Sequence, residues 1–224
     1  MHSNDYQRIV YTGTGLEAAG GTERGPTPLT LLEQWWEAAV ADPRVTEPAA
    51  ATLATFDVGT GLPDSRVLLI KDFDAQGLRF FTNRASAKGQ QLETTPAASI
   101  TMLWHPMFRQ VRFRGPVEQT SRDEDLAYWQ TRPRESQIGS SSSHQSQPVE
   151  SREQVAQNFQ KVERAHPDGE VPLPTTWGGY RLRPVEVEFW VGMPARLHDR
   201  VQWSADRPLP MDSNHGWSVQ RLQP

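Results

Sequence analysis

The chain has 224 residues, of which 36% are hydrophobic and 22% are charged, and its formal net charge at pH 7 is -4. This composition is typical of a globular protein with a sizeable core, and it excludes a disordered chain and a protein that binds nucleic acid through a general basic field. The chain has no cysteine, which excludes disulfides and thiolate ligands. It also lacks a secretory h-region and any run of ~20 apolar residues, so we expect a cytoplasmic protein that does not span a membrane.

The first half of the chain has the hydrophobic pattern of short strands with a few helices. Residues 1–26 are polar, and we expect a flexible N-terminal segment. Helices are predicted over residues 27–41 and 86–93. Strands are predicted where runs of branched and aromatic residues lie between turn residues, over residues 50–56, 65–71, 78–82, 98–104 and 110–119. The first three of these strands would form an antiparallel meander.

The second half of the chain continues this pattern. Helices are predicted over residues 123–132 and 149–165, and the four serines Ser140–Ser143 between them are typical of a flexible linker. Further strands are predicted over residues 180–191, 197–203 and 217–222. At least eight short strands with few helices predict a mainly β protein, an antiparallel β-barrel with peripheral helices. Residues 27–224 would form its single domain.

Four aliphatic residues stand between two cations in the segment from Arg66 to Lys71. Such a run predicts a buried strand, and a buried charge needs a counter-ion. No acid lies inside the run, so the counter-ions must come from elsewhere in the fold or from a ligand. Because side chains alternate along a strand, the two cations would point to opposite faces and could serve two separate anions. The alternative is a core strand with two ordinary salt bridges.

Basic residues beside small polar ones recur in other segments. Ser86 and Lys88 open a predicted helix, where backbone amides and the helix dipole favour a phosphate. Arg132 stands near Ser136, and the run from Arg196 to Arg200 is dense in polar residues. Cations with hydroxyls and amides suit phosphoester recognition, so a ligand with one or two phosphates and a flat ring fits these features. The alternative is a set of solvated surface charges. No metal site is predicted.

Eight blocks of sequence occur in a characteristic order between about Pro28 and Pro224. They are Arg66–Lys71, Phe81–Asn83 with Ser86 and Lys88, Arg109–Val111, Arg132–Gly139, Gln145-Ser146, Trp177–Arg181, Glu188–Trp190 and Arg196–Arg200. In this order and spacing the chain resembles the pyridoxamine 5'-phosphate oxidases. The resemblance implies an FMN-binding split β-barrel, antiparallel with Greek-key connections, that forms a homodimer with the flavin at the subunit interface. Residues 177–224 would be the C-terminal dimerisation part.

The resemblance also implies which residues bind the ligands. The residues expected to bind FMN are Arg66, Val67, Leu68, Leu69, Ile70, Lys71, Phe81, Thr82, Ser86, Lys88, Gln110, Gln145, Ser146, Trp190 and Arg200. The residues expected to bind the substrate are Lys71, Tyr128, Arg132, Ser136, Arg196 and His198, together with Arg8 and Tyr11 in an N-terminal lid. Of these, Arg196 and His198 would be the catalytic residues beside the substrate ring.

The implied reaction is oxidation of pyridoxine or pyridoxamine 5'-phosphate to pyridoxal 5'-phosphate. Hydride would pass to FMN, and dioxygen would reoxidise the flavin with release of hydrogen peroxide. The chain departs from the family pattern at several positions: Ser140-Ser141 replace a common Ala-Trp, Ala87 replaces a cation, Phe81 replaces a frequent Tyr, and residues 206–216 resemble an insertion. Two alternatives therefore remain, a phenazine-type flavin oxidase acting on a different ring and a non-catalytic flavin- or pyridoxal-phosphate-binding protein.

Overall fold

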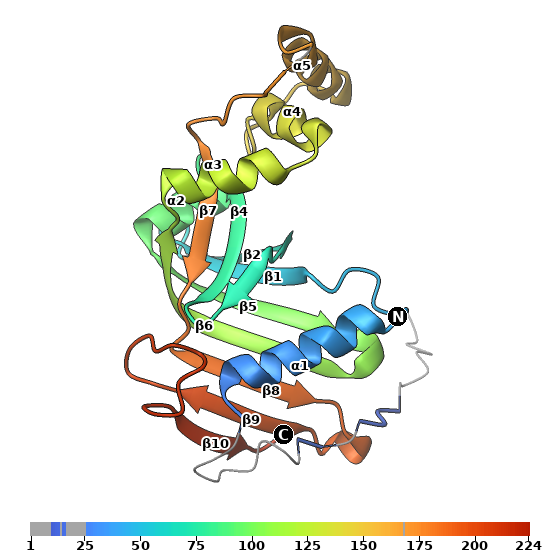
Figure 1. Cartoon of the computed structure of the whole chain (residues 1–224), viewed down its shortest axis with the longest axis vertical. Coiled ribbons are helices and arrows are strands. Elements are labelled where there is room, and N and C mark those ends of the chain that lie inside the picture. The colour runs from blue at the N-terminus through green and yellow to red at the C-terminus, as the bar shows by residue number, and fades with distance from the viewer. Residues whose placement is uncertain (1–9, 14, 17–25, 168) are drawn as a thin grey trace.

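The computed structural model describes residues 10–13, 15–16, 26–167 and 169–224, and every strand pair within these ranges is antiparallel (Figure 1). The strands are β1 (Ala50–Asp57), β2 (Leu62–Leu69), β3 (Asp72–Asp74), β4 (Gly77–Asn83), β5 (Ala97–Trp104), β6 (Arg109–Gln119), β7 (Trp177–Leu182), β8 (Glu186–Val191), β9 (Asp199–Ser204) and β10 (Ser218–Leu222). The helices are α1 (Pro28–Ala41), α2 (Ala87–Thr94), α3 (Arg122–Thr131), α4 (Arg134–Ser142) and α5 (Arg152–Ala165). The prediction of a mainly antiparallel protein with peripheral helices is confirmed.

Two sheets share the long strand β6. Seven strands form a large sheet in the order β10-β9-β8-β6-β5-β1-β2. Beyond Pro116, β6 leaves its partners in this sheet, and Val117–Gln119 pair with β7. β7 also pairs with β4, which pairs with β3, so these strands form a smaller sheet at the C-terminal end of β6. In Figure 1, α3, α4 and α5 lie at the end of the smaller sheet, and β8, β9 and β10 lie at the opposite end of the molecule.

The main core lies between one face of the large sheet and α1. Fully buried apolar side chains occupy this face in register across the strands, among them Leu53, Ile100, Phe113 and Val187. The Trp35 ring of α1 packs edge-on against Phe189 at a centroid distance of 5.1 Å. The N-cap Thr27, whose side chain accepts from the Thr30 amide, and Pro28 at the first helical position start α1 over this face.

We call the opposite face of the large sheet the open face. Its side chains in register across the strands include Val67, Thr52, Thr101, Arg112 and Glu188. Val67 is 69% exposed, although it is a branched apolar residue in the middle of a strand. An apolar side chain in this position suggests a surface that binds something else.

Three sequence-based predictions of local structure are wrong. The expected meander does not form, because β4 pairs with β3 and β7 rather than with β2. After β2 the chain forms the short β3–β4 hairpin instead. Its turn ends at Gly77, whose φ of 129° suits only glycine. The predicted strand 180–191 is two strands, β7 and β8, with different partners. They are separated around Pro184, which has no N–H for a ladder hydrogen bond.

The third wrong prediction concerns the four serines, because Ser140–Ser142 form the last turn of α4 instead of a flexible linker. Ile138 anchors this helix in a small second core with Trp129 and Trp177. The prediction of a buried strand from Arg66 to Lys71 also needs correction. β2 ends at Leu69, and one of its faces is open, because Val67 in the middle of the strand is 69% exposed.

No helix within the described ranges is long and apolar enough to cross a membrane.

Candidate functional site

A first group of predicted residues meets at the N-terminus of α2. The hydroxyl of Ser86 is the N-cap of this helix and is buried. The Lys88 ammonium donates to Ser86 Oγ at 3.3 Å and to Gln145 Oε1 at 3.0 Å, and Gln145 also accepts from the Thr82 hydroxyl at 3.1 Å. Lys88 makes no ion pair with any carboxylate that the structure describes. We call these four residues the Lys88 cluster.

Arg66 adds a second cation near the Lys88 cluster. Its guanidinium donates to the Thr55 hydroxyl at 2.6 Å and to Gln91 Oε1 at 3.1 Å, and it forms an ion pair with Asp64. Burial lowers the pKa of Lys88, and the positive charge of Arg66 lowers it further. Two cations and a helix N-terminus around one position form a ready site for a phosphate.

Asp64 is a residue that the sequence reasoning missed. No acid lies between Arg66 and Lys71, but Asp64 precedes Arg66 by two residues and shares its face of the strand. Strand alternation therefore indicates Asp64 as a counter-ion for Arg66.

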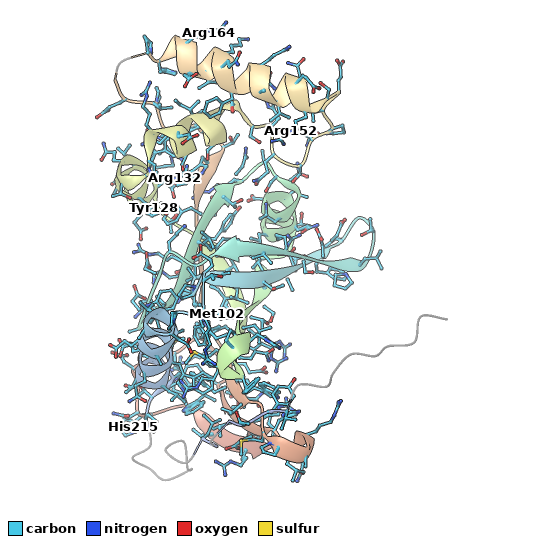
Figure 2. All side chains as sticks on the ribbon, turned by 90° about the vertical axis from the view of Figure 1, so that its right-hand side faces the viewer. Met102, Tyr128, Arg132, Arg152, Arg164 and His215 are labelled. Atoms are coloured by element: carbon cyan, nitrogen blue, oxygen red, sulfur yellow. The ribbon has the colours of Figure 1, made fainter. Side chains whose placement is uncertain are left out.

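A pocket of about 420 Å³ lies between β4, α3 and α4. The predicted site residues that line it are Leu69, Lys71, Phe81, Thr82, Tyr128, Arg132, Ser136 and Gln145. Figure 2 shows Tyr128 on α3 and Arg132 just after the end of this helix, both well away from the core residue Met102. The pocket thus contains four expected substrate-binding residues and reaches the Lys88 cluster through Thr82 and Gln145. It also contains residues that the sequence reasoning did not assign to the site: Asn83, Thr131, Pro133, Ser140, Ser143 and Trp177.

Aromatic rings form one wall of this pocket. Phe81 stacks on Tyr128 at 4.1 Å and on Trp177 at 5.3 Å. The Arg132 guanidinium lies 4.8 Å from the Trp177 ring centre and 5.0 Å from that of Trp129. Such a wall combines apolar contact for a flat ring with a cation for an anionic substituent.

The cations of the pocket lack carboxylate partners. Neither Lys71 nor Arg132 forms an ion pair with any described acid. Loss of hydration lowers the pKa of Lys71, the negative charge of Glu47 opposes this shift, and the positive charge of Arg132 adds to it. Burial also lowers the pKa of Arg132 and raises that of the Tyr128 hydroxyl. Two neighbouring cations without a carboxylate in ion-pair contact favour an anionic ligand.

A second group of predicted residues lies on and beside β6, β8 and β9, in the part of the large sheet away from β2. Gln110, Trp190 and Arg200 are neighbours in register. The Trp190 and His198 rings are 4.6 Å apart, and Tyr11 packs edge-on against His198 at 5.2 Å. We call these five residues the Trp190 group.

The charged residues near the Trp190 group differ in how firmly they are held. Arg200 donates to Glu188 Oε1 at 2.8 Å, and Glu188 is buried and also accepts from Arg112 at 2.6 Å. Burial would raise the pKa of Glu188, but these two guanidinium groups outweigh it and lower that pKa. Arg196, in contrast, is exposed in a short turn with a φ of 62°.

Within one chain, the structure does not bring the two groups together. None of Gln110, Trp190, Arg196, His198 and Arg200 lines the pocket, and Figure 1 places β8 and β9 far from α3 and α4.

The remaining predicted residues take several positions. Ile70 is buried, and Leu68 is partly buried against the core. Ser146 is exposed in a turn after α4, with a φ of 71°. Arg8 lies outside the described residues, so the proposed lid stays a prediction.

Comparisons with known proteins agree with this geometry. Residues 38–165 match the family model described as pyridoxamine 5'-phosphate oxidase, and residues 177–224 match the pyridoxine 5'-phosphate oxidase C-terminal dimerisation region. A pyridoxine/pyridoxamine 5'-phosphate oxidase of Saccharopolyspora erythraea is 44% identical over 92% of this chain and 91% of its own length. One from Bordetella petrii is 44% identical over the full length of both chains.

Solved structures are also similar. PhzG from Burkholderia lata, crystallised with tetrahydrophenazine-1-carboxylic acid, has a TM-score of 0.83 and 30% identity, and the match covers 96% of this chain and 100% of PhzG. An FMN-binding protein of Nostoc punctiforme has a TM-score of 0.67 and 18% identity, over 87% of this chain and 95% of that one. The fold is therefore that of the FMN-binding split barrels. The chain belongs to the pyridoxamine 5'-phosphate oxidase family.

Proposed function

We propose that the protein is an FMN-dependent oxidase that converts pyridoxine or pyridoxamine 5'-phosphate to pyridoxal 5'-phosphate. Family membership supports an oxidoreductase of this type with FMN as its cofactor. The substrate assignment rests on two cations, because Lys71 and Arg132 both line one aromatic-walled pocket. Neither has a carboxylate partner among the described residues, and burial lowers the pKa of each. A phosphate handle on a flat ring matches this arrangement.

The Lys88 cluster and Arg66 would hold the FMN phosphate. Lys88 supplies a partly buried ammonium, Ser86 a hydroxyl at the helix N-terminus, and Arg66 a guanidinium fixed by three side chains. Arg84 does not replace the cation that the family pattern has at position 87, where this chain has Ala87. Its guanidinium is bound to Asp125 and to backbone carbonyl groups. The donor set is complete enough for one phosphate without a further cation.

A homodimer would complete the site. The dimerisation region at residues 177–224 supports self-association, and it carries Trp190, His198 and Arg200. None of the three lines the pocket of its own chain, and β8 and β9 lie at the opposite end of the molecule from α3 and α4 (Figure 1). We propose that the Trp190 group and Arg196 of one subunit face the pocket of the other, with the open faces of the two large sheets at the interface.

In this assembly the side chains mainly bind and orient. The bound flavin supplies the redox chemistry, as acceptor of hydride from the substrate and donor of electrons to dioxygen. Lys71, Arg132, Ser136 and Tyr128 would fix the phosphate, so that binding energy remote from the reacting carbon orients the ring. Arg196 would stabilise negative charge that develops on the ring, and His198 would orient a polar ring substituent.

A phenazine-type oxidase is the second candidate, because the structurally similar PhzG carries a tetrahydrophenazine ligand. The pocket residues favour the first reading. The segment from Arg132 to Ser136 is intact, and both of its ends line the pocket with Lys71. A ring with a single carboxylate would balance the two cations less completely than a phosphate, at a cost in desolvation.

Anaerobic reduction of the purified protein tests the proposal. Pyridoxine or pyridoxamine 5'-phosphate should bleach the yellow flavin absorbance, and air should restore it with formation of hydrogen peroxide. Unphosphorylated pyridoxine, at the same concentration, should bleach it far more slowly. No bleaching by either phosphorylated vitamer would refute the assignment, and bleaching by a dihydrophenazine carboxylate alone would support the second candidate. A colourless protein that fails to bind added FMN would refute both.

A further inference from the structure

Arg132 in the pocket is oriented by an unusual set of contacts. It caps the C-terminus of α3, and its guanidinium rests over the rings of Trp129 and Trp177 at 5.0 and 4.8 Å. Contacts with ring faces hold a guanidinium at a fixed height, but they impose little direction within the plane of the ring. A second type of contact is needed to aim its N–H groups at one point.

Ser140 supplies the directional contact. Its hydroxyl accepts from the Arg132 guanidinium at 2.9 Å, and both residues line the pocket. Among the residues in the described ranges, this is the single hydrogen bond made by the Arg132 side chain, and no ion pair involves it. Ser140 is one of the positions at which the chain departs from the Ala-Trp pattern noted above.

The chemistry of a hydroxyl suits this task. A carboxylate at this position would also orient the guanidinium, but it would neutralise the charge and compete with an anionic ligand. A serine accepts one N–H and leaves both the positive charge and the remaining donors of Arg132 free for the pocket. The neighbouring Lys71 lacks a described carboxylate partner as well, so the pocket keeps both of its cations.

We propose that Ser140 is a positioning residue that aims the Arg132 guanidinium at the phosphate of the substrate. This role rests on the proposed function, because it assigns the pocket cations to a substrate phosphate. Helix α4 fixes Ser140 relative to Arg132, eight residues earlier in the chain.

Steady-state kinetics of the FMN-loaded enzyme separate this role from a merely structural one. Ser140→Ala should raise the KM for pyridoxine 5'-phosphate by about three- to tenfold and leave kcat nearly unchanged, because one hydrogen bond to a charged group is lost. The KM for unphosphorylated pyridoxine should not change. Ser140→Thr should restore the KM, and Ser140→Asp should raise it more than alanine does.

Ser142→Ala is the matched control. Ser142 belongs to the same turn of α4, but its hydroxyl donates to the Gly139 carbonyl and does not contact Arg132. This variant should keep the KM of the wild type. An unchanged KM in Ser140→Ala, or an equal rise for phosphorylated and unphosphorylated pyridoxine, would overturn the positioning role while leaving the proposed function intact.

Titration with inorganic phosphate keeps the test independent of turnover. Calorimetry on the FMN-loaded protein, in which the flavin phosphate site is filled, should give a dissociation constant about three- to tenfold higher for Ser140→Ala than for the wild type. If no vitamer is oxidised, the proposed function fails, and this ratio still decides the role of Ser140. Equal phosphate affinities in the two proteins would overturn it.

Discussion

Lys88, the proposed partner of the FMN phosphate, should make flavin binding sensitive to pH. Burial lowers its pKa from the ordinary lysine value of 10.5, and the charge of Arg66 adds to this effect. The ammonium group binds a phosphate only when it is protonated. The affinity for FMN should therefore be retained at neutral pH and should fall as pH rises through the lowered pKa, below pH 10.5. The ratio of FMN to riboflavin affinity, measured by fluorescence titration of the apoprotein, isolates the phosphate from ionisation of the flavin ring.

Substitution of Lys88 checks this assignment. Lys88→Met should weaken FMN binding by about tenfold or more, because a charge-assisted hydrogen bond is lost, and it should abolish the alkaline fall in the affinity ratio. Lys88→Arg should retain the charge across the alkaline range and flatten the fall with less loss of affinity. If the alkaline fall persisted in Lys88→Met, another group would be responsible and the prediction would be wrong.

We expect the N-cap residue of helix α2 to have both a structural task and a binding task. Ser86 accepts from the Gly89 amide at 3.4 Å, which caps the helix, and its hydroxyl also contacts Lys88. Ser86→Ala should therefore lower the free energy of unfolding by about 1 kcal/mol through loss of the cap. It should also weaken FMN binding, because the Lys88 ammonium loses one of its two acceptors.

Helix α3 offers a control for this prediction. Ser121 caps α3 in a capping box with Glu124, far from the Lys88 cluster along the chain. Ser121→Ala should cost a similar free energy of unfolding, about 1 kcal/mol, without any change in FMN affinity. Urea denaturation of the apoproteins and FMN titration measure the two effects separately. Equal FMN affinity in the two variants would contradict a binding role for Ser86.

Local patterns predicted most helices and strands, but they failed where contacts between distant segments determine the local structure. The cap and apolar spacing at the start of α1 are properties of a few neighbouring residues, so this helix could be read directly from the sequence. The serine run became part of α4 because Ile138 packs against Trp129 and Trp177, which lie on other elements. Packing against distant residues overrides the weak helix propensity of serine.

For the whole molecule, the open face of the large sheet is the proposed interface between two copies. Val67 on this face is 69% exposed, and Val40 on α1 is 58% exposed on the other side of the sheet. Val67→Lys should abolish the dimer and release FMN, because it buries an unpaired charge in the interface. Val40→Lys should leave both unchanged. Light scattering gives the mass, and flavin absorbance gives the occupancy.

The two measurements need not change together. A monomer that retains FMN would contradict the proposal that the second subunit completes the site. A dimer that persists in Val67→Lys would place the interface on another surface. Loss of the dimer in Val40→Lys as well would indicate general destabilisation, which thermal denaturation of both variants would reveal.

Much of the candidate site could be predicted because its signals are short blocks of sequence. Ser86 and Lys88 lie within one helical turn, so local rules place them together at a helix N-terminus. The gathering of Lys71, Arg132 and Ser140 in one pocket was beyond such rules, because it depends on how β4, α3 and α4 pack. The roles assigned by resemblance to the Trp190 group stay predictions, since one chain alone does not bring these residues to the pocket.

The sequence by itself determined the balance of strands and helices, the family and the residues that bear charge. Alternation of apolar and polar residues, helix capping and the order of motifs are properties of the sequence, and they can be recognised without knowledge of the fold. Only the tertiary structure decided that β4 pairs with β7 and that β2 lies at an edge with Val67 exposed. These outcomes depend on contacts between segments far apart in the chain or on which face of a strand is covered, and no short pattern encodes either.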